Sequence, residues 1–295
     1  MEIYRMNKRV KNFILTPMNL LYRINPELNL KILYRLRTHR KLNLENPKTY
    51  SEKLQWMKLN YKNKLLPICA DKYEVRQFVK ECGCENILTK LLWEGYNPND
   101  IPFKDLPQQF VIKVTHGSGT VIICKDKNRL NIPKTIRALK LRLKEKYLPC
   151  YGEWFYGVIR PRIVIEEFLD DGKGYSPVDY KIYCFHGKPK YIIAHVDRFT
   201  NHRSNIYDLE WNPIKNISTK EIDPNLTIEK PKELNQLLRY ARILSESFIH
   251  VRVDLYILNS QIYFGELTFI SDSGFLRINP IEAEEEIGSW IKLPS

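Results

Sequence analysis

The amino-acid sequence predicts an α+β fold, in which helices pack against largely antiparallel sheets. Three observations predict it: helical patterns occupy most of the first 83 residues, strand-like patterns begin at about residue 108, and two adjacent strand-like runs stand near the end of the sequence. The chain has 295 residues, 43% of them hydrophobic, which is enough for one large or two modest domains with real cores.

The expected helices are recognised by their apolar spacing and their end signals. Residues 1–45 alternate basic and apolar positions in a helical pattern. Residues 49–52 read Thr-Tyr-Ser-Glu, a capping-box pattern, and the apolar residues behind it keep helical spacing. A helix at 71–83 opens with an Asp and a Glu three residues apart and ends at a glycine. A very basic helix is expected at about 134–147, and a long one from Pro231.

The expected strands are runs in which apolar residues alternate or cluster without helical spacing. They lie at 110–115, 120–124, 162–166, 179–185, 190–196, 251–258 and 262–269. The dipeptide His186-Gly187 separates two of them and predicts a hairpin turn.

A glycine-rich segment follows the first strand, which carries Lys113. Because side chains alternate along a strand, Lys113 can point towards a cleft. Gly117 and Gly119 would let backbone N–H groups approach phosphate oxygens, the Ser118 hydroxyl would donate, and the lysine would neutralise charge. The alternative is an ordinary hairpin turn with a surface lysine, which this pattern alone favours. No Gly-Lys-Ser/Thr follows, so the segment is not a Walker loop.

Two carboxylates are expected to face each other in the last pair of strands. If the loop between them is the three residues 259–261, Asp254 stands opposite Glu266 and Arg252 opposite Thr268, with Cβ atoms ~5 Å apart. Opposed carboxylates repel unless a cation lies between them, and a hard divalent ion with oxygen ligands is the natural occupant. A two-residue loop would place the acids on opposite faces, and a different register would leave both acids solvated.

A third candidate is the apolar strand that ends in Glu166 and Glu167 and is followed two residues later by Leu169. Such a strand could border a cleft in which backbone groups pair with a flat heterocycle. The alternative is an ordinary strand end, where acidic residues are common.

Along the chain, the lysine with its glycine-rich segment comes first, the strand that ends in Glu166 second, and the strand pair with Asp254 and Glu266 third. In that order, the three features resemble the ATP-grasp superfamily. More narrowly, the chain resembles the TupA-like ATP-grasp family of bacterial polysaccharide and teichuronopeptide biosynthesis. The segments that carry the closer match are TYSEKLQWMKL (49–59), ADKYEVRQFV (70–79), LPQQFVIKVTHGSG (106–119), PRIVIEEFL (161–169), DYKIYCFHGKPK (179–190), VDR (196–198) and VRVDLYILNSQIYFGELTF (251–269). They extend from about residue 45 to the end of the sequence.

The resemblance implies an ATP-grasp fold in which two α+β subdomains sandwich ATP. A helical N-terminal region would occupy 1–70, a lid subdomain with the glycine loop 71–169, and a core subdomain with the metal site 170–295. By position in the family pattern, Lys113 would contact the α and β phosphates. The loop from His116 to Gly119 would cover the β and γ phosphates.

The resemblance also implies how the adenosine and the reacting groups are held. Glu166, the Glu167 carbonyl and the Leu169 amide would contact the adenine edge. Asp179 would take the ribose hydroxyls and Lys181 a phosphate. The transferring phosphoryl group would be faced by Arg252 and Arg198.

The same resemblance implies a Mg²⁺ site at Asp254, Glu266 and Thr268. Thr268 departs from the family pattern, in which this position is commonly Asn. A hydroxyl is a poorer Mg²⁺ ligand than an amide carbonyl, so a second metal ion at this corner is in doubt.

The chemistry implied is an ATP-dependent carboxylate–amine ligation through an acyl phosphate. The family setting suggests the uronic acid of a capsule or cell-wall polymer as the carboxylate, and an amino acid or amine as its partner. Basic residues exceed acidic ones by 47 − 34 = 13, which agrees with an acidic saccharide substrate. No nucleic-acid-binding module is recognisable, so no nucleic acid is expected. The alternatives are a glycosyltransferase of the same pathway, for which no Asp-x-Asp motif is present, and a non-catalytic protein that binds acidic glycans.

Cellular location is predicted from the N-terminal segment and the cysteines. Charged and Asn residues interrupt the apolar positions of the first 24 residues and no small-residue cleavage site follows, so no signal peptide is predicted. Six scattered cysteines predict free thiols in a reducing cytoplasm. The basic N-terminal segment permits peripheral contact with an anionic membrane, although a plain surface helix is the simpler interpretation.

Overall fold

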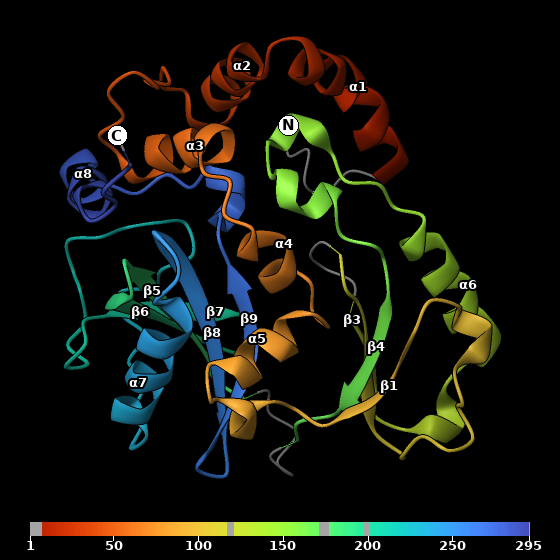
Figure 1. Ribbon diagram of the computed structural model, residues 1–295. Helices are drawn as coiled ribbons and strands as arrows, with labels where there is room; N and C mark the ends of the chain where they lie inside the picture. The colour runs from red at the N-terminus through yellow and green to blue at the C-terminus, as the bar shows by residue number, and fades with distance from the viewer. Residues whose placement is uncertain (1–7, 117–120, 171–176, 198–200, 295) are drawn as a thin grey trace.

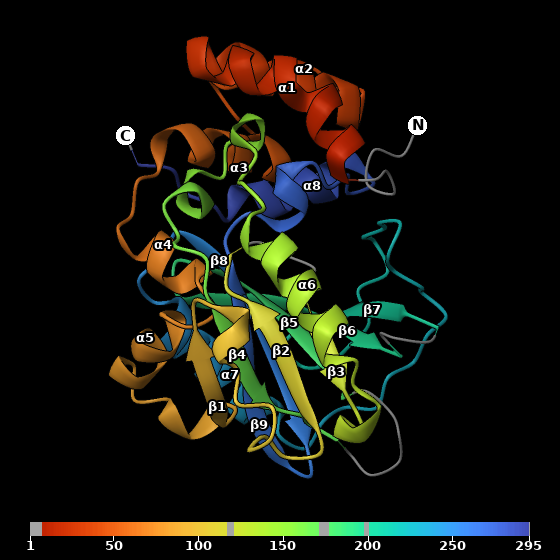
Figure 2. The ribbon, with the colours of Figure 1, turned by 90° about the vertical axis from the view of Figure 1, so that its right-hand side faces the viewer.

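The computed structural model describes residues 8–116, 121–170, 177–197 and 201–294. It confirms the mixed α+β fold, with two antiparallel sheets (Figures 1 and 2). The four-stranded sheet has the order β1 (Leu91–Gly95), β4 (Ile163–Glu167), β2 (Phe110–Val114) and β3 (Val121–Cys124). The five-stranded sheet has the order β7 (Arg203–Tyr207), β6 (Lys188–Val196), β5 (Asp179–Phe185), β8 (His250–Leu258) and β9 (Gln261–Thr268).

Eight α-helices lie in the described residues. They are α1 (Lys8–Ile24), α2 (Pro26–Thr38), α3 (Tyr50–Asn60), α4 (Leu65–Ala70), α5 (Val75–Glu81), α6 (Ile132–Leu143), α7 (Leu234–Ser245) and α8 (Ile281–Ser289). Leu139 of α6 is buried in the core of the four-stranded sheet, and α7 buries its apolar face in the core of the five-stranded sheet. Figure 1 shows α4 and α5 between the two sheets.

Apolar residues of α3, α4 and α5 belong to the larger core, together with those of the five-stranded sheet, α7 and α8. The smaller core belongs to the four-stranded sheet and α6. Helices α1 and α2 pack on a short 3-10 turn, Pro149–Tyr151, in one further cluster, and α2 packs on Leu42 and Leu44 in another. The subdomain boundaries at 70 and 169 stay predictions. No helix of the described ranges is long and apolar enough to span a membrane.

Local signals in the sequence account for several element ends. The capping box at the start of α3 is confirmed: the Thr49 hydroxyl accepts from the Glu52 N–H, and the Glu52 carboxylate accepts from the Thr49 N–H. Asp71 caps a turn rather than a helix, because its Oδ1 accepts from the N–H groups of Tyr73 and Glu74. Helix α5 begins only at Val75, after this turn. Helix α7 likewise begins at Leu234, three residues after the predicted start.

Hairpin turns join the central strands of the larger sheet. His186 and Gly187 have φ angles of 48° and 73° between β5 and β6, which confirms the predicted hairpin. Two strands were not predicted: β1, which is short and follows a 3-10 turn, and β7, which is rich in polar residues.

Candidate functional site

The β8–β9 hairpin places Asp254 opposite Glu266 and Arg252 opposite Thr268, as predicted, but by a different route. Its loop has two residues, 259 and 260, both with positive φ, which suits the right-handed twist of a tight hairpin. That loop alone would have separated the two acids onto opposite faces. A β-bulge after Asp254 shifts the register by one residue and brings the carboxylates back to the same face.

Gly265 is the extra residue of this bulge. A Cβ atom there would lie 2.7 Å from Cε2 of Tyr256 and 3.0 Å from the carbonyl oxygen of Asp254. The backbone oxygen cannot move aside as a flexible side chain can, so only glycine fits. A glycine inside a strand pattern is a recognised signal of a bulge, and it was the signal available in the sequence.

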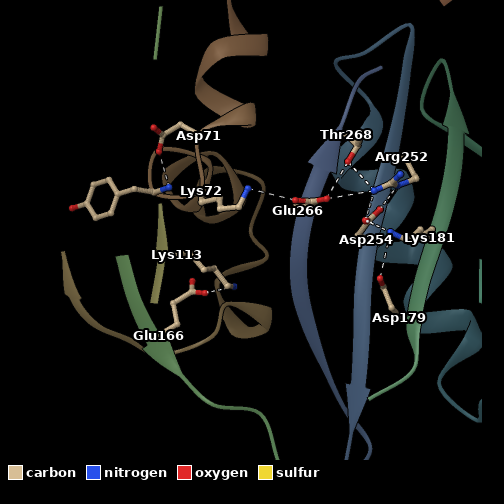
Figure 3. Close-up of polar contacts among 11 residues, drawn as sticks. Asp71, Lys72, Lys113, Glu166, Asp179, Lys181, Arg252, Asp254, Glu266 and Thr268 are labelled. Atoms are coloured by element: carbon tan, nitrogen blue, oxygen red, sulfur yellow. Dashed lines mark hydrogen bonds and ion pairs between the residues drawn. The ribbon is translucent and has the colours of Figure 1, made fainter. Parts of the chain in front are cut away.

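Asp254 is the centre of a buried ionic cluster on the five-stranded sheet (Figure 3). Arg252 donates to it twice, from Nε to Oδ1 and from Nη2 to Oδ2, both at 2.6 Å. Lys181 donates to Oδ2 at 3.2 Å and lies 3.4 Å from the Asp179 carboxylate. Burial raises the pKa of Asp254, but the charges of Arg252 and Lys181 outweigh it and hold this pKa below its usual value.

Glu266 lies at the edge of this cluster, with 40% of its side chain exposed. Its Oε2 is 3.6 Å from Lys72 Nζ, and its Oε1 is 3.4 Å from Arg252 Nη2. Burial raises the pKa of Glu266, whereas Lys72 and Arg252 lower it, and the net shift is downward. The Thr268 hydroxyl accepts from Arg252 at 3.0 Å. The cation between the two carboxylates is therefore Arg252.

Lys113 and Glu166 form a second cluster on the four-stranded sheet. Glu166 is opposite Val111 in the register, so Lys113 lies diagonally from it on the same face, and Nζ is 2.5 Å from Oε2. Arg76 of α5 donates to the other oxygen, Oε1, at 3.1 Å. Burial raises the pKa of Glu166, but the charges of Lys113 and Arg76 outweigh this effect and hold the pKa below its usual value. The carboxylate therefore stays charged.

Lys72 and Arg76 are the site residues that sequence reasoning missed. They stand four residues apart around the start of α5; Lys72 contacts the larger sheet through Glu266, and Arg76 the smaller one through Glu166. Figure 3 shows Lys72 extending towards Glu266 between the two groups of side chains. Both lie in a segment, 70–79, that carries the family resemblance, and their i, i+4 spacing was the available signal.

The other predicted site residues are placed less centrally. The His116 Nε2 atom lies 2.9 Å from the Glu145 carbonyl oxygen, and the Glu167 carboxylate accepts from the Lys90 N–H at 2.8 Å. Leu169 follows β4 and is half-buried. Four of the predicted site residues lie outside the described residues: Gly117, Ser118, Gly119 and Arg198.

A cavity of about 240 Å³ adjoins Arg252 and Lys181. Its other lining residues are Tyr183, Ile193, His195, His202, Glu221 and Asp272. The rings of His195 and His202 stack with centroids 5.1 Å apart, and His195 Nδ1 is 2.8 Å from His202 Nε2. Burial, and then the charge of Lys181, lower the pKa of His195 to about 3, so this ring is neutral at neutral pH.

Cations carried by both sheets and by α5, each held against a carboxylate, define a site suited to a polyanionic ligand such as a phosphate ester. A scan against protein families matches residues 52–292 to the family described as TupA-like ATPgrasp. The chain belongs to this family, as the sequence resemblance predicted.

Solved structures with similar folds include several ligases. A D-alanine–D-alanine ligase from Bacillus anthracis, complexed with ATP, is 18% identical with a TM-score of 0.41, over 68% of this chain and 55% of that chain. An L-amino acid ligase from Bacillus licheniformis is 15% identical with a TM-score of 0.47, over 76% of this chain and 49% of that chain. The ATP-grasp ligase PsnB, complexed with a phosphomimetic variant of its minimal precursor, Mg and ADP, is 14% identical with a TM-score of 0.44, over 82% and 66%.

This chain thus spans about half the length of the first two ligases. All three TM-scores lie below 0.5, so the family assignment rests on the sequence match alone. A search of curated proteins finds no match.

Proposed function

We propose that this protein is an ATP-dependent ligase that joins a carboxylate to an amine and releases ADP and phosphate. The observation that carries the proposal is a pair of ionic clusters on two different sheets: Lys113 with Glu166, and Arg252 with Asp254. Lys72, in the turn before α5, reaches towards the second cluster through Glu266. A nucleoside triphosphate carries enough negative charge to use cations from both sheets. Membership of an ATP-grasp family supports ATP as this nucleotide.

The residues present fit a Mg²⁺ ion. Mg²⁺ takes oxygen ligands, and in phosphate-binding sites it is held by one or two carboxylates together with phosphates and water. Asp254 and Glu266 face each other, and the half-exposed Glu266 can turn towards a ligand. Among the described residues no three His, Cys, Asp or Glu side chains gather as a complete metal site, so the phosphates would have to complete the coordination. When bound, Mg²⁺ would supply positive charge at the phosphoryl oxygens.

The proposed reaction has two steps. A substrate carboxylate oxygen attacks the γ-phosphorus, the bond to ADP breaks, and an acyl phosphate forms. The amine then attacks the acyl carbon, the C–N bond forms, the C–O bond breaks, and phosphate leaves with the electron pair. Lys113 would neutralise charge on the nucleotide phosphates, and Arg252 would stabilise the oxyanion of the second step, because fixed cations in a partly buried site need no reorganisation.

The 240 Å³ cavity beside Arg252 is the proposed amine site. It is lined by acidic groups, Glu221 and Asp272, that can hold an ammonium group, and by cations at the end nearest Asp254. His195, which is stacked on His202, lines the same cavity and stays neutral there, so it adds no positive charge that would repel an ammonium group. The cavity is smaller than most small-molecule sites, ~300–1,000 Å³, which favours an amino acid or small amine over a polymer segment.

The carboxylate is proposed to belong to an acidic saccharide, such as a uronic acid of a bacterial capsule or cell-wall polymer. The family's setting in polysaccharide biosynthesis and the net charge of +13 support this substrate class. A further support is a shallow hollow of about 480 Å³ along α6, which is lined by Arg137, Lys140 and Lys144 together with the apolar Pro133, Ile136 and Leu141. Its cations can pair with the carboxylates of an acidic glycan.

The test is a thermal-shift titration with ATP, ADP and several UDP-sugars, each with and without Mg²⁺, followed by an assay of ADP release with acidic saccharides and amines. A ligand that binds the native state raises the melting temperature according to its affinity. Stabilisation by adenine nucleotides that Mg²⁺ strengthens is expected. A shift with UDP-sugars alone would point to a glycosyltransferase, and no shift with any nucleotide would point to a glycan-binding protein.

The cavity has its own test within that assay. Glu221→Gln and His202→Ala are expected to raise the KM for the amine while ATP still raises the melting temperature as in the wild type. A matched control is Glu210→Gln, which changes an exposed acid that does not line the cavity. An unchanged amine KM in both cavity variants would remove the amine from this cavity and leave the nucleotide site standing.

A further inference from the structure

An exposed row of aliphatic side chains runs along α1 and α2. Ten large hydrophobic side chains are exposed in the parts of the chain that the structure describes, and five of them belong to these two helices. Leu20 and Ile24 stand four residues apart on α1, and Leu28, Ile32 and Leu36 stand four residues apart on α2, so each helix has one exposed aliphatic stripe; the two stripes together are the aliphatic row. Single exposed aliphatic residues are ordinary, but a regular row on adjacent helices is an apolar surface.

The opposite side of α2 accounts for how the helix is held. Leu30, Leu33 and Tyr34 are buried against the rest of the protein. With 3.6 residues per turn, Leu28 and Leu36 project from the other side of the helix. The row is therefore not an unfilled part of the core, because α2 already has an apolar face that fills it.

Both views place α1 and α2 as the outermost layer at one end of the molecule (Figures 1 and 2). They lie beyond α3 and α8, on the side away from the β8–β9 turn. A flat partner could reach the row at this end without touching either sheet.

Basic residues accompany the row. Residues 8–41 contain nine Lys or Arg and one Glu, so they carry +8 of the chain's net charge of +13. Arg23 and Arg35 are exposed beside the aliphatic row, and Lys31 lies along its edge, paired with Glu27 at 2.5 Å. This combination of an aliphatic row and flanking cations is typical of helices that lie in a membrane interface.

We propose that α1 and α2 dock on an anionic lipid membrane, with the aliphatic row entering the acyl boundary and the cations contacting lipid headgroups. Charge selects this occupant. A second copy of the chain would bring two positively charged segments together, whereas an anionic bilayer neutralises them and attracts each cation near its surface. The surface is separate from the proposed ligase site, so its test needs neither nucleotide nor substrate.

The test is co-sedimentation of the full chain with lipid vesicles, one set of phosphatidylcholine alone and one with an equal part of phosphatidylglycerol. Binding to the anionic vesicles, weakened by salt, is expected. The variant Leu20→Gln/Leu36→Gln should lower the partition coefficient by about tenfold or more, because two aliphatic side chains no longer enter the bilayer.

Two variants separate the surface from general effects. The control Leu141→Gln/Val158→Gln changes side chains of matched exposure, 59% and 65%, that lie elsewhere, as against 59% and 65% for Leu20 and Leu36. It should bind vesicles like the wild type. The variant Arg23→Gln/Arg35→Gln should weaken binding to anionic vesicles selectively. All variants change exposed side chains, and equal melting temperatures would confirm that each is folded.

Three outcomes would overturn the proposal. The first is failure of the wild type to bind anionic vesicles, and the second is equal loss of binding in the row variant and its control. The third is a concentration-dependent dimer in light scattering that Leu20→Gln/Leu36→Gln abolishes, which would assign the row to a second copy of the chain.

Discussion

Lys113→Met separates the structural role of this lysine from its proposed role in binding nucleotide. The substitution keeps the aliphatic stem and removes the ammonium group that lies 2.5 Å from Glu166. Removing one partner of a buried ion pair costs ~3–5 kcal/mol when the other is left alone. Here Arg76 still contacts Glu166, and Lys113 is 26% exposed, so we expect a smaller loss of about 1–3 kcal/mol in the free energy of unfolding.

The effect on nucleotide binding is expected to be distinct. A hydrogen bond to a charged group contributes ~1.5–3 kcal/mol, so loss of the Lys113–phosphate contact should weaken ATP about 10- to 100-fold. Isothermal titration with ATP and Mg²⁺ would measure the affinity, and urea unfolding the stability.

A second pair of variants makes the result decisive. Glu166→Gln alone removes the buried carboxylate but leaves Lys113 free to bind phosphate. Lys113→Met/Glu166→Gln removes both charges and should recover much of the stability lost in Lys113→Met. If the lysine binds phosphate, the double variant should still bind ATP about tenfold or more weakly than Glu166→Gln. Equal ATP affinity in these two variants would refute the reasoning and leave Lys113 as a structural partner of Glu166.

Two further predictions concern the larger sheet. Gly265→Ala should lower the free energy of unfolding by about 1–3 kcal/mol and reduce the stabilisation by ATP with Mg²⁺, because the new Cβ meets the Asp254 carbonyl oxygen; unchanged urea and thermal-shift curves would show that glycine is not needed at the bulge. His250 is buried between Tyr50 and Cys184, and this burial lowers its pKa to about 4. In the unfolded state its pKa is near 6.5, so between pH 4 and pH 6.5 the unfolded state binds more protons than the folded state. Stability is therefore lost as pH falls through this window, by up to about 3 kcal/mol for this group, and His250→Gln should remove that component; a difference between wild type and variant that is constant from pH 7 to pH 4 would contradict it.

The opposition of Asp254 and Glu266 was predicted correctly from the sequence, but from the wrong loop length. Strand alternation placed both acids on one face only with a three-residue loop, whereas the loop has two residues. The bulge at Gly265 supplies the missing shift of one residue. Both loops satisfy the hydrophobic pattern equally well, so periodicity cannot choose between them, and the glycine was the only local clue.

Contacts between distant segments could not be predicted in this way. Lys72 lies 194 positions before Glu266, and Arg76 lies 90 positions before Glu166. Their four-residue spacing predicts that Lys72 and Arg76 lie near each other, but not which sheets they reach. Those partners depend on how α5 packs between the sheets, and this is decided by burial of Val75, Phe78 and Val79 in the larger core.

The pairing of charges in the site has a consequence for how it would bind its ligands. Lys113, Arg252 and Lys72 are each held against a carboxylate: Glu166, Asp254 and Glu266 respectively. Phosphates alone would draw Arg252 and Lys72 away from Asp254 and Glu266 and leave Asp254 with Lys181 as a weaker partner, and Mg²⁺ alone would displace the cations from these carboxylates. The two together leave each of these charges with a strong partner, since weakly paired buried charges are costly. Nucleotide and Mg²⁺ should therefore each increase the affinity for the other by the same factor, as linkage requires. The titration of ATP at several Mg²⁺ concentrations measures that factor, and a value of one would show that the ion pairs stay closed when the nucleotide binds.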